Sequence, residues 1–114
     1  MLKPTITFDD YSKLDVRIGQ VIAAEDIAKQ NGYIKLDVNF GPEIGTRTCI
    51  TNLGKSGQYH AHDFLRLSFP FVLNFEPRTV AKHVSNCMIL AAMDEHTSSY
   101  LVSSDRGTPG AVVI

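Results

Sequence analysis

The stretch IKLDVNF (residues 34–40) alternates apolar and polar side chains without interruption. Strict alternation puts the apolar side chains on one face of a β-strand and the polar ones on the other. The segment GPEIG (residues 41–45) follows with turn-forming residues, and residues 46–53 read as a further strand. The sequence therefore predicts a half-buried strand, a turn and a second strand, as part of an all-β fold.

Further strands are predicted on both sides of this pair. Residues 16–24 are rich in β-forming side chains and are interrupted by Gly19, and a glycine inside a strand usually marks a bulge or a sharp bend. Residues 69–75 form an apolar run in which Pro70 suits the entrance of a strand better than its centre. Residues 87–93 are apolar at both odd and even positions, which predicts a strand buried on both faces.

Shorter elements complete the pattern. We expect a helix over residues 8–12, with Thr7 and Asp10 as a capping box, and a helical turn over residues 61–65. Residues near Tyr100 and the final residues 111–114 supply two more short strands. Five or six short strands with irregular connections predict a small closed or partly closed barrel.

The length of 114 residues fits a single domain, predicted to span residues 1–114, because no repeat or Pro/Gly-rich linker divides the chain. No apolar run approaches the roughly 18 residues that span a bilayer. The amino-terminal residues lack the apolar segment of a secretory signal, so Cys49 and Cys87 are expected to be buried, reduced thiols. These features predict a cytoplasmic protein without membrane insertion.

The formal net charge of −1 lacks the strongly basic balance of proteins that bind nucleic acid through bulk charge. The charge is nevertheless unevenly distributed. Residues 46–88 carry five basic and two acidic side chains, a net of +3, together with three of the four histidines. This part of the chain would form a mildly positive face if it is contiguous in space, and the alternative is charge scattered over a solvated surface.

Sequence motifs of common enzymes are missing, since there is no Gly-x-Ser-x-Gly elbow, Walker loop or Cys–His pair at a family spacing. His60 and His62 have the spacing of two metal ligands on an extended segment, but no third strong ligand accompanies them. We therefore predict a protein that is not an enzyme, with no catalytic residue, metal ion or cofactor.

Two segments carry a more specific signal. Residues 13–19, KLDVRIG, resemble the opening "K-hydrophobic-D-hydrophobic-R-x-G" of the tRNA-binding-domain family. Residues 74–88 match its second signature through Asn74, Pro77, Arg78, Ser85 and Met88. Residues 39–45 and 109–112 are similar to the free-standing CsaA-like branch of that family. Together the four matches make the resemblance extend over residues 8–114.

The resemblance implies a five-stranded oligonucleotide/oligosaccharide-binding (OB) barrel with a short N-terminal helix and C-terminal strand additions. In the CsaA-like branch these additions form a homodimer. The implied interface residues are Phe8, Tyr11, Val112 and Ile114, and packing of the same residues into the core of one domain is the alternative. A symmetric partner would bury the apolar ends of both subunits with one patch.

The resemblance also implies an RNA-binding surface made by Arg17, Asn74, Arg78, Lys82 and Ser85. A guanidinium at Arg78 can make two parallel hydrogen bonds to a phosphate or a base edge. Asn74 offers a donor and an acceptor for a base, and Ser85 a donor for a phosphate. Two alternatives stay open, since Arg17 could brace the barrel through Asp15 and Met88 suits the core better than a base.

The implied function is non-catalytic binding of structured RNA such as tRNA by a homodimer. Glu76 and Asn86 depart from the family pattern, and an exposed acid near Arg78 is expected to weaken anion binding by about 1 kcal/mol. The alternative function is that of a CsaA-like export chaperone, which holds unfolded preprotein segments and for which the run Phe64, Phe69, Phe71 and Phe75 would line pockets. A third possibility is a subunit of an aminoacyl-tRNA synthetase complex.

Overall fold

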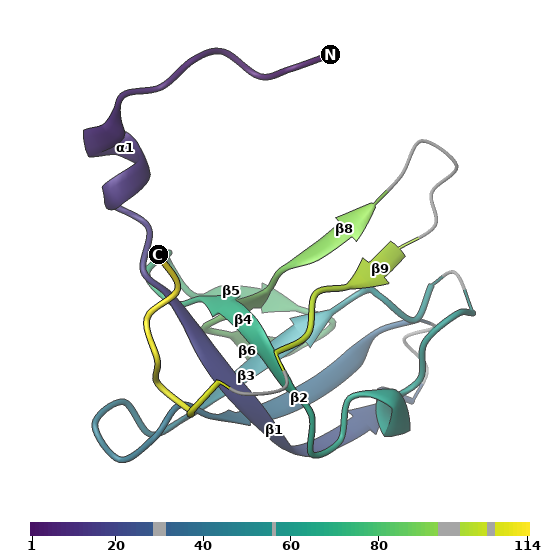
Figure 1. Ribbon diagram of the computed structural model, residues 1–114. Coiled ribbons are helices and arrows are strands. Elements are labelled where there is room, and N and C mark those ends of the chain that lie inside the picture. The colour runs from purple at the N-terminus through teal and green to yellow at the C-terminus, as the bar shows by residue number, and fades with distance from the viewer. Residues whose placement is uncertain (29–31, 56, 94–98, 105–106) are drawn as a thin grey trace.

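The computed structural model describes the chain except for residues 29–31, 56, 94–98 and 105–106 (Figure 1). Most of the described residues form strands and the loops between them, with one short helix α1 and one 3-10 turn η1. In chain order the elements are α1 (Phe8–Ser12), β1 (Val16–Asp26), β2 (Ile34–Asn39), β3 (Thr46–Thr51), η1 (Ala61–Asp63), β4 (Ser68–Val72), β5 (Arg78–Val80), β6 (His83–Ser85), β7 (Met88–Ile89), β8 (Ala91–Met93) and β9 (Ser99–Leu101).

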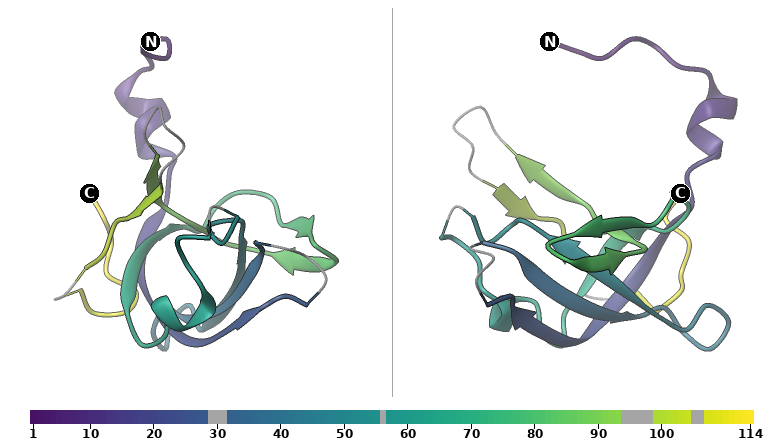
Figure 2. Two further views of the ribbon diagram at one scale, coloured as in Figure 1. Left: turned by 90° about the vertical axis from the view of Figure 1, so that its right-hand side faces the viewer. Right: turned by 180° about the vertical axis from the view of Figure 1, so that it is seen from behind.

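The main sheet has the antiparallel order β3-β2-β1-β4-β7 and curls into a nearly closed barrel (Figures 1 and 2). The long strand β1 serves both halves of the sheet. Its first residues, 16–20, pair with β4, and residues 20–26 pair with β2. The predicted all-β barrel is therefore confirmed, with β1 as the strand that turns the sheet.

Hydrogen bonds between β3 and the segment after β6 join the two ends of the sheet. The Asn86 N–H donates to the Thr48 carbonyl at 2.9 Å, and the Thr48 N–H donates to the Asn86 side-chain oxygen at 3.0 Å. The Ser85 hydroxyl accepts from the Ile50 N–H at 3.0 Å. These bonds pair backbone groups that would otherwise be exposed at a sheet edge.

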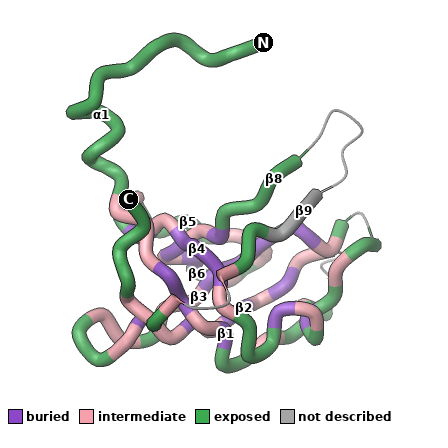
Figure 3. The backbone as a smooth tube through the Cα atoms, in the orientation of Figure 1, coloured by how far each residue is buried: buried purple, intermediate pink, exposed green. Residues whose placement is uncertain are grey.

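Aromatic side chains fill the interior of the barrel. Phe40, Phe64, Phe69 and Phe71 are at most 1% exposed, and the Phe40 and Phe71 rings pack edge to face with centroids 5.4 Å apart. Three of the four phenylalanines in the predicted run, Phe64, Phe69 and Phe71, are thus core residues and do not line an open pocket. Figure 3 shows this buried interior against the exposed ends of the chain.

Gly19 provides space for this core. A Cβ on Gly19 would lie 2.4 Å from Val38 Cγ1 and 2.5 Å from Phe40 Cε1, both in buried side chains. The predicted bulge is not at Gly19, because the register of β1 against β2 shifts between Val21 and Ala23. The glycine is required by close packing, and the irregularity of the strand falls two residues later.

Pro70 lies in the middle of β4, and the prediction of a strand entrance there was wrong. Its partner in β1 is Ile18, whose own N–H and carbonyl bond to Ala111 and Gly110 on the other side of β1. The Pro70–Ile18 pair therefore exchanges no backbone hydrogen bonds, and the missing N–H of the proline costs the β1–β4 ladder nothing.

The predicted strand over residues 87–93 divides at Leu90. Its first part, β7, pairs with β4, whereas β8 pairs with β9 and projects from the barrel as a hairpin (Figure 1). Ala91, Ala92 and Met93 are all exposed, so the expectation of burial on both faces was wrong for them. Two of the three residues of β8 are alanines, which expose little apolar surface. A segment that is apolar in sequence can therefore form an exposed hairpin strand as well as a core strand.

The C-terminal segment lies beside the start of β1, close to helix α1 (Figure 1). The C-terminal segment lies along β1 through an isolated bridge between Arg17 and Val112, flanked by hydrogen bonds from Ile18 N–H to Ala111 and from Val113 N–H to Val16. Helix α1 precedes β1 and is capped by the Thr7 hydroxyl, which accepts from the Asp10 N–H at 3.1 Å. The predicted helix and C-terminal addition are thus confirmed.

Two of the sequence matches contact each other at this place. Gly41 (φ 89°) and Gly110 (φ 92°) are left-handed, and a Cβ on Gly110 would lie 2.5 Å from the Phe40 carbonyl oxygen. A Cβ on Gly41 would lie 2.9 Å from the Pro109 carbonyl oxygen. The β2–β3 turn and the C-terminal turn therefore approach through their backbones, which only glycine permits at both positions.

Candidate nucleic-acid interface

A short hairpin, β5–β6, stands out from the barrel between β4 and β7 (Figure 2). Arg78 pairs with Ser85 and Val80 with His83, so the turn between the strands has only two residues. These are Ala81 (φ 50°) and Lys82 (φ 68°), both left-handed. A two-residue turn with two positive φ angles is of type I′, which normally carries Asn-Gly. The backbone thus holds the exposed Lys82 at the tip of the hairpin in a costly conformation.

A groove runs between this hairpin and the end of β3. Its first part encloses about 160 Å³ and is lined by Arg78 and Val80 of β5 together with Tyr33, Ile50, Thr51, Asn52 and Met88. A second part of about 230 Å³ shares Thr51, Asn52 and Met88 and extends to Ala91, Ala92 and Met93 of β8. We call the whole depression the hairpin groove. It has a cationic end at Arg78 and an apolar end at β8.

The cations around the hairpin groove are available for an anionic ligand. Arg78 is exposed, and in the described part of the chain its guanidinium has no hydrogen bond and no ion pair. The Lys55 ammonium lies 4.7 Å from the centre of the Tyr33 ring, at the edge of the same groove. Arg78, Lys55 and Lys82 therefore offer charge that no carboxylate among the described residues neutralises through an ion pair.

Arg17 lies in β1, outside the lining of the hairpin groove, and its guanidinium is used within the protein. Its Nε donates to Asp15 at 2.6 Å and its Nη1 to the Gly110 carbonyl at 3.2 Å. The hydrogen bond with Asp15 raises the pKa of Arg17. This geometry corresponds to the bracing alternative predicted for Arg17, because it ties β1 to the C-terminal segment.

The Asn74 amide is also engaged with backbone groups. Its oxygen accepts from the Asp15 N–H at 2.7 Å, and its nitrogen donates to the Lys13 carbonyl. These two bonds connect the end of β4 to the segment between α1 and β1. One donor and one acceptor position of the Asn74 amide are therefore used within the chain.

Ser85 is fully buried, and its hydroxyl donates to the Cys87 carbonyl at 3.1 Å while accepting from Ile50. A phosphate cannot reach this hydroxyl in the conformation described, so we leave Ser85 out of the interface. The neighbouring thiols of Cys49 and Cys87 are free and buried, as predicted. A hydrogen bond to Cys49 together with burial raises the pKa of Cys87.

The predicted dimer residues lie together on the surface. Phe8, Tyr11, Val112 and Ile114 are between 49% and 100% exposed. With Leu14 and neighbouring residues they line an open hollow of about 570 Å³ between α1 and the C-terminal segment. We call these five side chains the terminal patch. None of them enters the core, so the alternative of burial within one domain is wrong.

Other site types find less support. The His60 and His62 rings are nearly parallel, with centroids 5.9 Å apart. Among the described residues, no group of three or more His, Cys, Asp or Glu side chains is placed to hold a metal ion. In the same part of the chain, no helix is long and apolar enough to cross a membrane.

The sequence did not single out every residue of the hairpin groove. Tyr33 directly precedes the predicted strand over residues 34–40, Asn52 lies near the end of the predicted strand over residues 46–53, and Lys55 lies in a polar loop. No periodic pattern marks these three residues as part of a groove. Met88 was expected in the core, but it is half-buried and lines the floor of the groove. Only the tertiary fold brings these four residues beside Arg78.

The chain is similar to known proteins over most of its length. The family model "Putative tRNA binding domain" matches residues 16–111. The methionine–tRNA ligases of Methanococcoides burtonii and Chlorobium chlorochromatii are each 34% identical over 112 residues. Those residues are 97% of this chain but only 16% and 15% of the two ligases. The chain thus spans about one sixth of the length of these relatives.

Solved structures resemble the chain over nearly its full length. A MetRS-related protein from Pyrococcus horikoshii is 29% identical, with a TM-score of 0.88 and coverage of 98% of this chain and 100% of the other. The chaperone CsaA from Bacillus anthracis is 26% identical, with a TM-score of 0.85 and coverage of 97% and 100%. Since the family model also covers far more than half of the residues, the chain belongs to the tRNA-binding domain family.

Proposed function

We propose that the chain binds structured RNA such as tRNA, without catalysing a reaction, and that the hairpin groove receives the RNA. Arg78 contacts a phosphate or a base edge, and Lys82 and Lys55 add charge along the backbone. Tyr33 and Met88 supply faces on which a splayed base can pack. The cytoplasm, where tRNA is used, is the proposed location.

One observation carries this proposal, namely the exposed Arg78 guanidinium beside a groove, with no carboxylate bound to it in the described part of the chain. An arginine left unpaired at a concave surface is suited to bidentate binding of phosphate. Family membership supports the choice of RNA as the ligand, and methionine–tRNA ligases are enzymes that act on tRNA.

Titration of labelled tRNA at several salt concentrations tests the proposal. Arg78→Ala is expected to weaken binding by roughly 5- to 150-fold and to reduce the magnitude of the salt slope by about 1, as expected for loss of one phosphate contact. Arg66→Ala is the matched control, because Arg66 is an exposed arginine outside the hairpin groove. Equal affinities and slopes for wild type and Arg78→Ala would contradict the proposed site.

The proposed assembly is a homodimer joined through the terminal patch. A hollow rimmed by Phe8, Tyr11 and Ile114 exposes apolar side chains that are costly to leave in water. A two-fold axis through this patch would bury it on both subunits at once. The hairpin groove is lined by other residues, so dimerisation would leave it open.

A second candidate function is that of a chaperone for unfolded preprotein segments, since the CsaA relative is named a chaperone. The exposed apolar surface that would favour it is the terminal patch and the apolar end of the hairpin groove at Met93. Fluorescence titration of one preparation with tRNA and with an unfolded peptide separates the two functions. Saturable binding of the peptide alone would favour the chaperone.

A further inference from the structure

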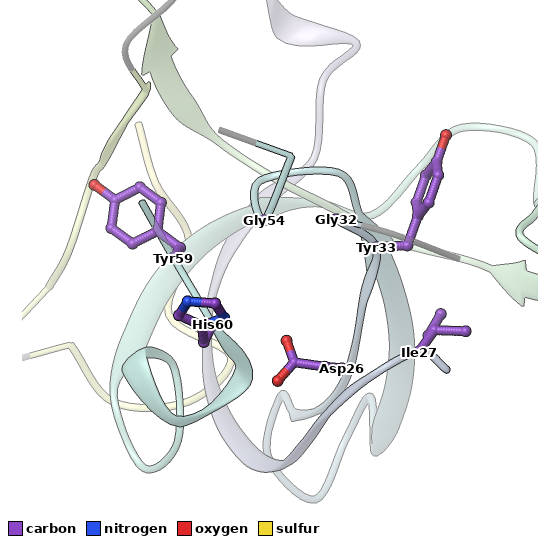
Figure 4. A pocket seen from close by; sticks show the side chains of 7 residues that line it. All are labelled: Asp26, Ile27, Gly32, Tyr33, Gly54, Tyr59 and His60. Carbon is purple, nitrogen blue, oxygen red and sulfur yellow. The ribbon is translucent and has the colours of Figure 1, made fainter. Parts of the chain in front are cut away.

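A second pocket, of about 450 Å³, lies where β1 ends and β2 begins (Figure 4). Its volume falls within the range of small-ligand sites. We call it the Asp26 pocket. It is lined by Asp26, Ile27, Gly32, Tyr33, Gly54, Tyr59 and His60.

Two glycines bring separate backbone segments together in this lining. The Gly54 N–H donates to the Gly32 carbonyl at 3.0 Å, and a Cβ on Gly54 would lie 2.9 Å from that carbonyl oxygen. Glycine is therefore needed at position 54 for this close approach, which holds the wall of the pocket in place.

Aromatic side chains stand on opposite sides of the pocket, Tyr33 on one and Tyr59 on the other (Figure 4). Aromatic faces are the usual platform for nucleobases. Tyr33 also lines the hairpin groove, and the Lys55 ammonium lies 4.7 Å from its ring centre. A strand of RNA bound in the hairpin groove would thus reach the pocket across Tyr33, with Lys55 near its backbone.

The polar group of the pocket is a carboxylate. The Asp26 side chain points into the pocket toward His60 (Figure 4). Its Oδ1 accepts from the Ala61 N–H at 3.1 Å, which fixes its position, and no ion pair neutralises it in the described part of the chain. A carboxylate repels phosphate and accepts hydrogen bonds only, so it selects a ligand edge that carries donors.

Guanine fits this requirement best among the four bases. Its Watson–Crick edge presents two adjacent donors, N1–H and the exocyclic amine. Adenine and cytosine place an acceptor nitrogen beside their amine, and uracil has a single N–H between two carbonyls. We propose that the Asp26 pocket binds an unpaired guanine of the RNA, an inference that rests on the proposed function for its biological ligand.

Titration with the four ribonucleoside 5′-monophosphates, followed by the amide resonances of the protein, tests the pocket separately from RNA. All four carry the same phosphate and differ only in the base. GMP is expected to shift the amides of Gly32, Gly54 and His60 and to bind roughly 5- to 150-fold more tightly than AMP, CMP or UMP, the range for a bidentate base contact.

Asp26→Asn is expected to remove the preference for GMP. One carboxylate oxygen, an acceptor, is replaced by an amide NH2 group, a donor, while the remaining oxygen can still accept from the Ala61 N–H. Glu25→Gln is the matched control. It makes the same change of charge at the neighbouring residue, which is exposed and lines a different hollow. The control is expected to keep the full preference for GMP.

The outcomes separate the two proposals. GMP shifts at the pocket together with no tRNA binding would refute the RNA function and leave a guanine nucleotide site. Absence of these shifts, equal shifts with AMP, or a GMP preference retained in Asp26→Asn would overturn the pocket proposal, whatever the affinity for tRNA.

Discussion

The Ser85 hydroxyl satisfies a buried backbone group where the two ends of the sheet meet. It accepts from the Ile50 N–H and donates to the Cys87 carbonyl, and the side chain is fully buried. A buried donor without a partner costs free energy because its bond to water is lost and nothing replaces it. The hydroxyl therefore contributes to the stability of the barrel.

Ser85→Ala should lower the free energy of unfolding by about 1–3 kcal/mol, since the Ile50 N–H would lose its partner. Urea unfolding measures this change, with Ser103→Ala at an exposed position as the control. The affinity of the folded variant for tRNA should stay unchanged. A loss of affinity with unchanged stability would instead return Ser85 to the RNA-binding surface.

The residues predicted to bind RNA differ in what their polar groups contact. Arg78 is exposed and lines a groove, and its role in RNA binding stays a prediction. Arg17, Asn74 and Ser85 belong to the same sequence signatures, yet their polar groups bond within the barrel. A sequence signature indicates that a certain residue type is required at a position. Only the fold shows whether that side chain binds the protein's own backbone or is free to bind a ligand.

At the scale of elements, the β5–β6 hairpin combines exposed charge with a costly turn. Ala81 and Lys82 both adopt left-handed backbone angles that glycine or asparagine would accept more readily. Strain of this kind persists when surrounding structure or function requires the side chain. We interpret Lys82 as a residue kept for its charge at some cost to stability.

Glycine substitutions in this turn should separate stability from binding. Ala81→Gly and Lys82→Gly should each raise the free energy of unfolding by roughly 0.5 to 1 kcal/mol, because relief of the left-handed conformation exceeds the added entropy of the unfolded chain. Only Lys82→Gly should weaken tRNA binding, by several-fold and with a smaller salt slope.

Urea unfolding and salt-dependent tRNA titration of both variants check this prediction. Ala81→Gly is the internal control, since it changes the turn without changing charge. Wild-type affinity in Lys82→Gly would show that the hairpin tip lies away from the RNA.

The regular strands were predictable, and the exceptions have physical causes. Alternation located β2 closely because one of its faces is buried and the other is not. The β5–β6 hairpin was missed because Ala-Lys lacks the turn signal of Asn-Gly. The position of Pro70 within its strand was predicted wrongly. A strand accepts a proline wherever the missing N–H is not needed for a hydrogen bond to the neighbouring strand, and this depends on which edge of β4 the proline nitrogen faces. No local sequence pattern contains that information.

At the scale of the whole molecule, the terminal patch lies on a different part of the surface from the hairpin groove, as their linings show. Apolar side chains of α1, residues 14 and 16 and the C-terminal segment line one hollow there. Such surface on a small domain favours association with a second copy.

Sedimentation velocity should therefore show a dimer that dissociates on dilution. Phe8→Ser and Ile114→Asp should shift the protein to monomer at concentrations where the wild type is dimeric. Ile22→Asp is the control, because Ile22 is 50% exposed but lies outside the patch. A wild-type protein that remains monomeric at high concentration would contradict the assembly.

The fold of the whole molecule followed from its sequence more completely than its binding surface did. Four short matches in order identified the barrel, and the contact between the Gly41 and Gly110 turns explains why two of them occur together. The groove joins Tyr33, Asn52, Arg78 and Met88 from separate segments. No local sequence pattern in any of these segments indicates that the four residues lie together.

The central claim is that RNA lies in the hairpin groove. Titration of the protein with tRNA, followed residue by residue through its amide resonances, tests it most directly. We predict the largest changes in residues 78–85 and at Tyr33 and Asn52, with small changes in α1. Changes confined to α1 and the C-terminal segment, with the β5–β6 hairpin unaffected, would contradict the claim.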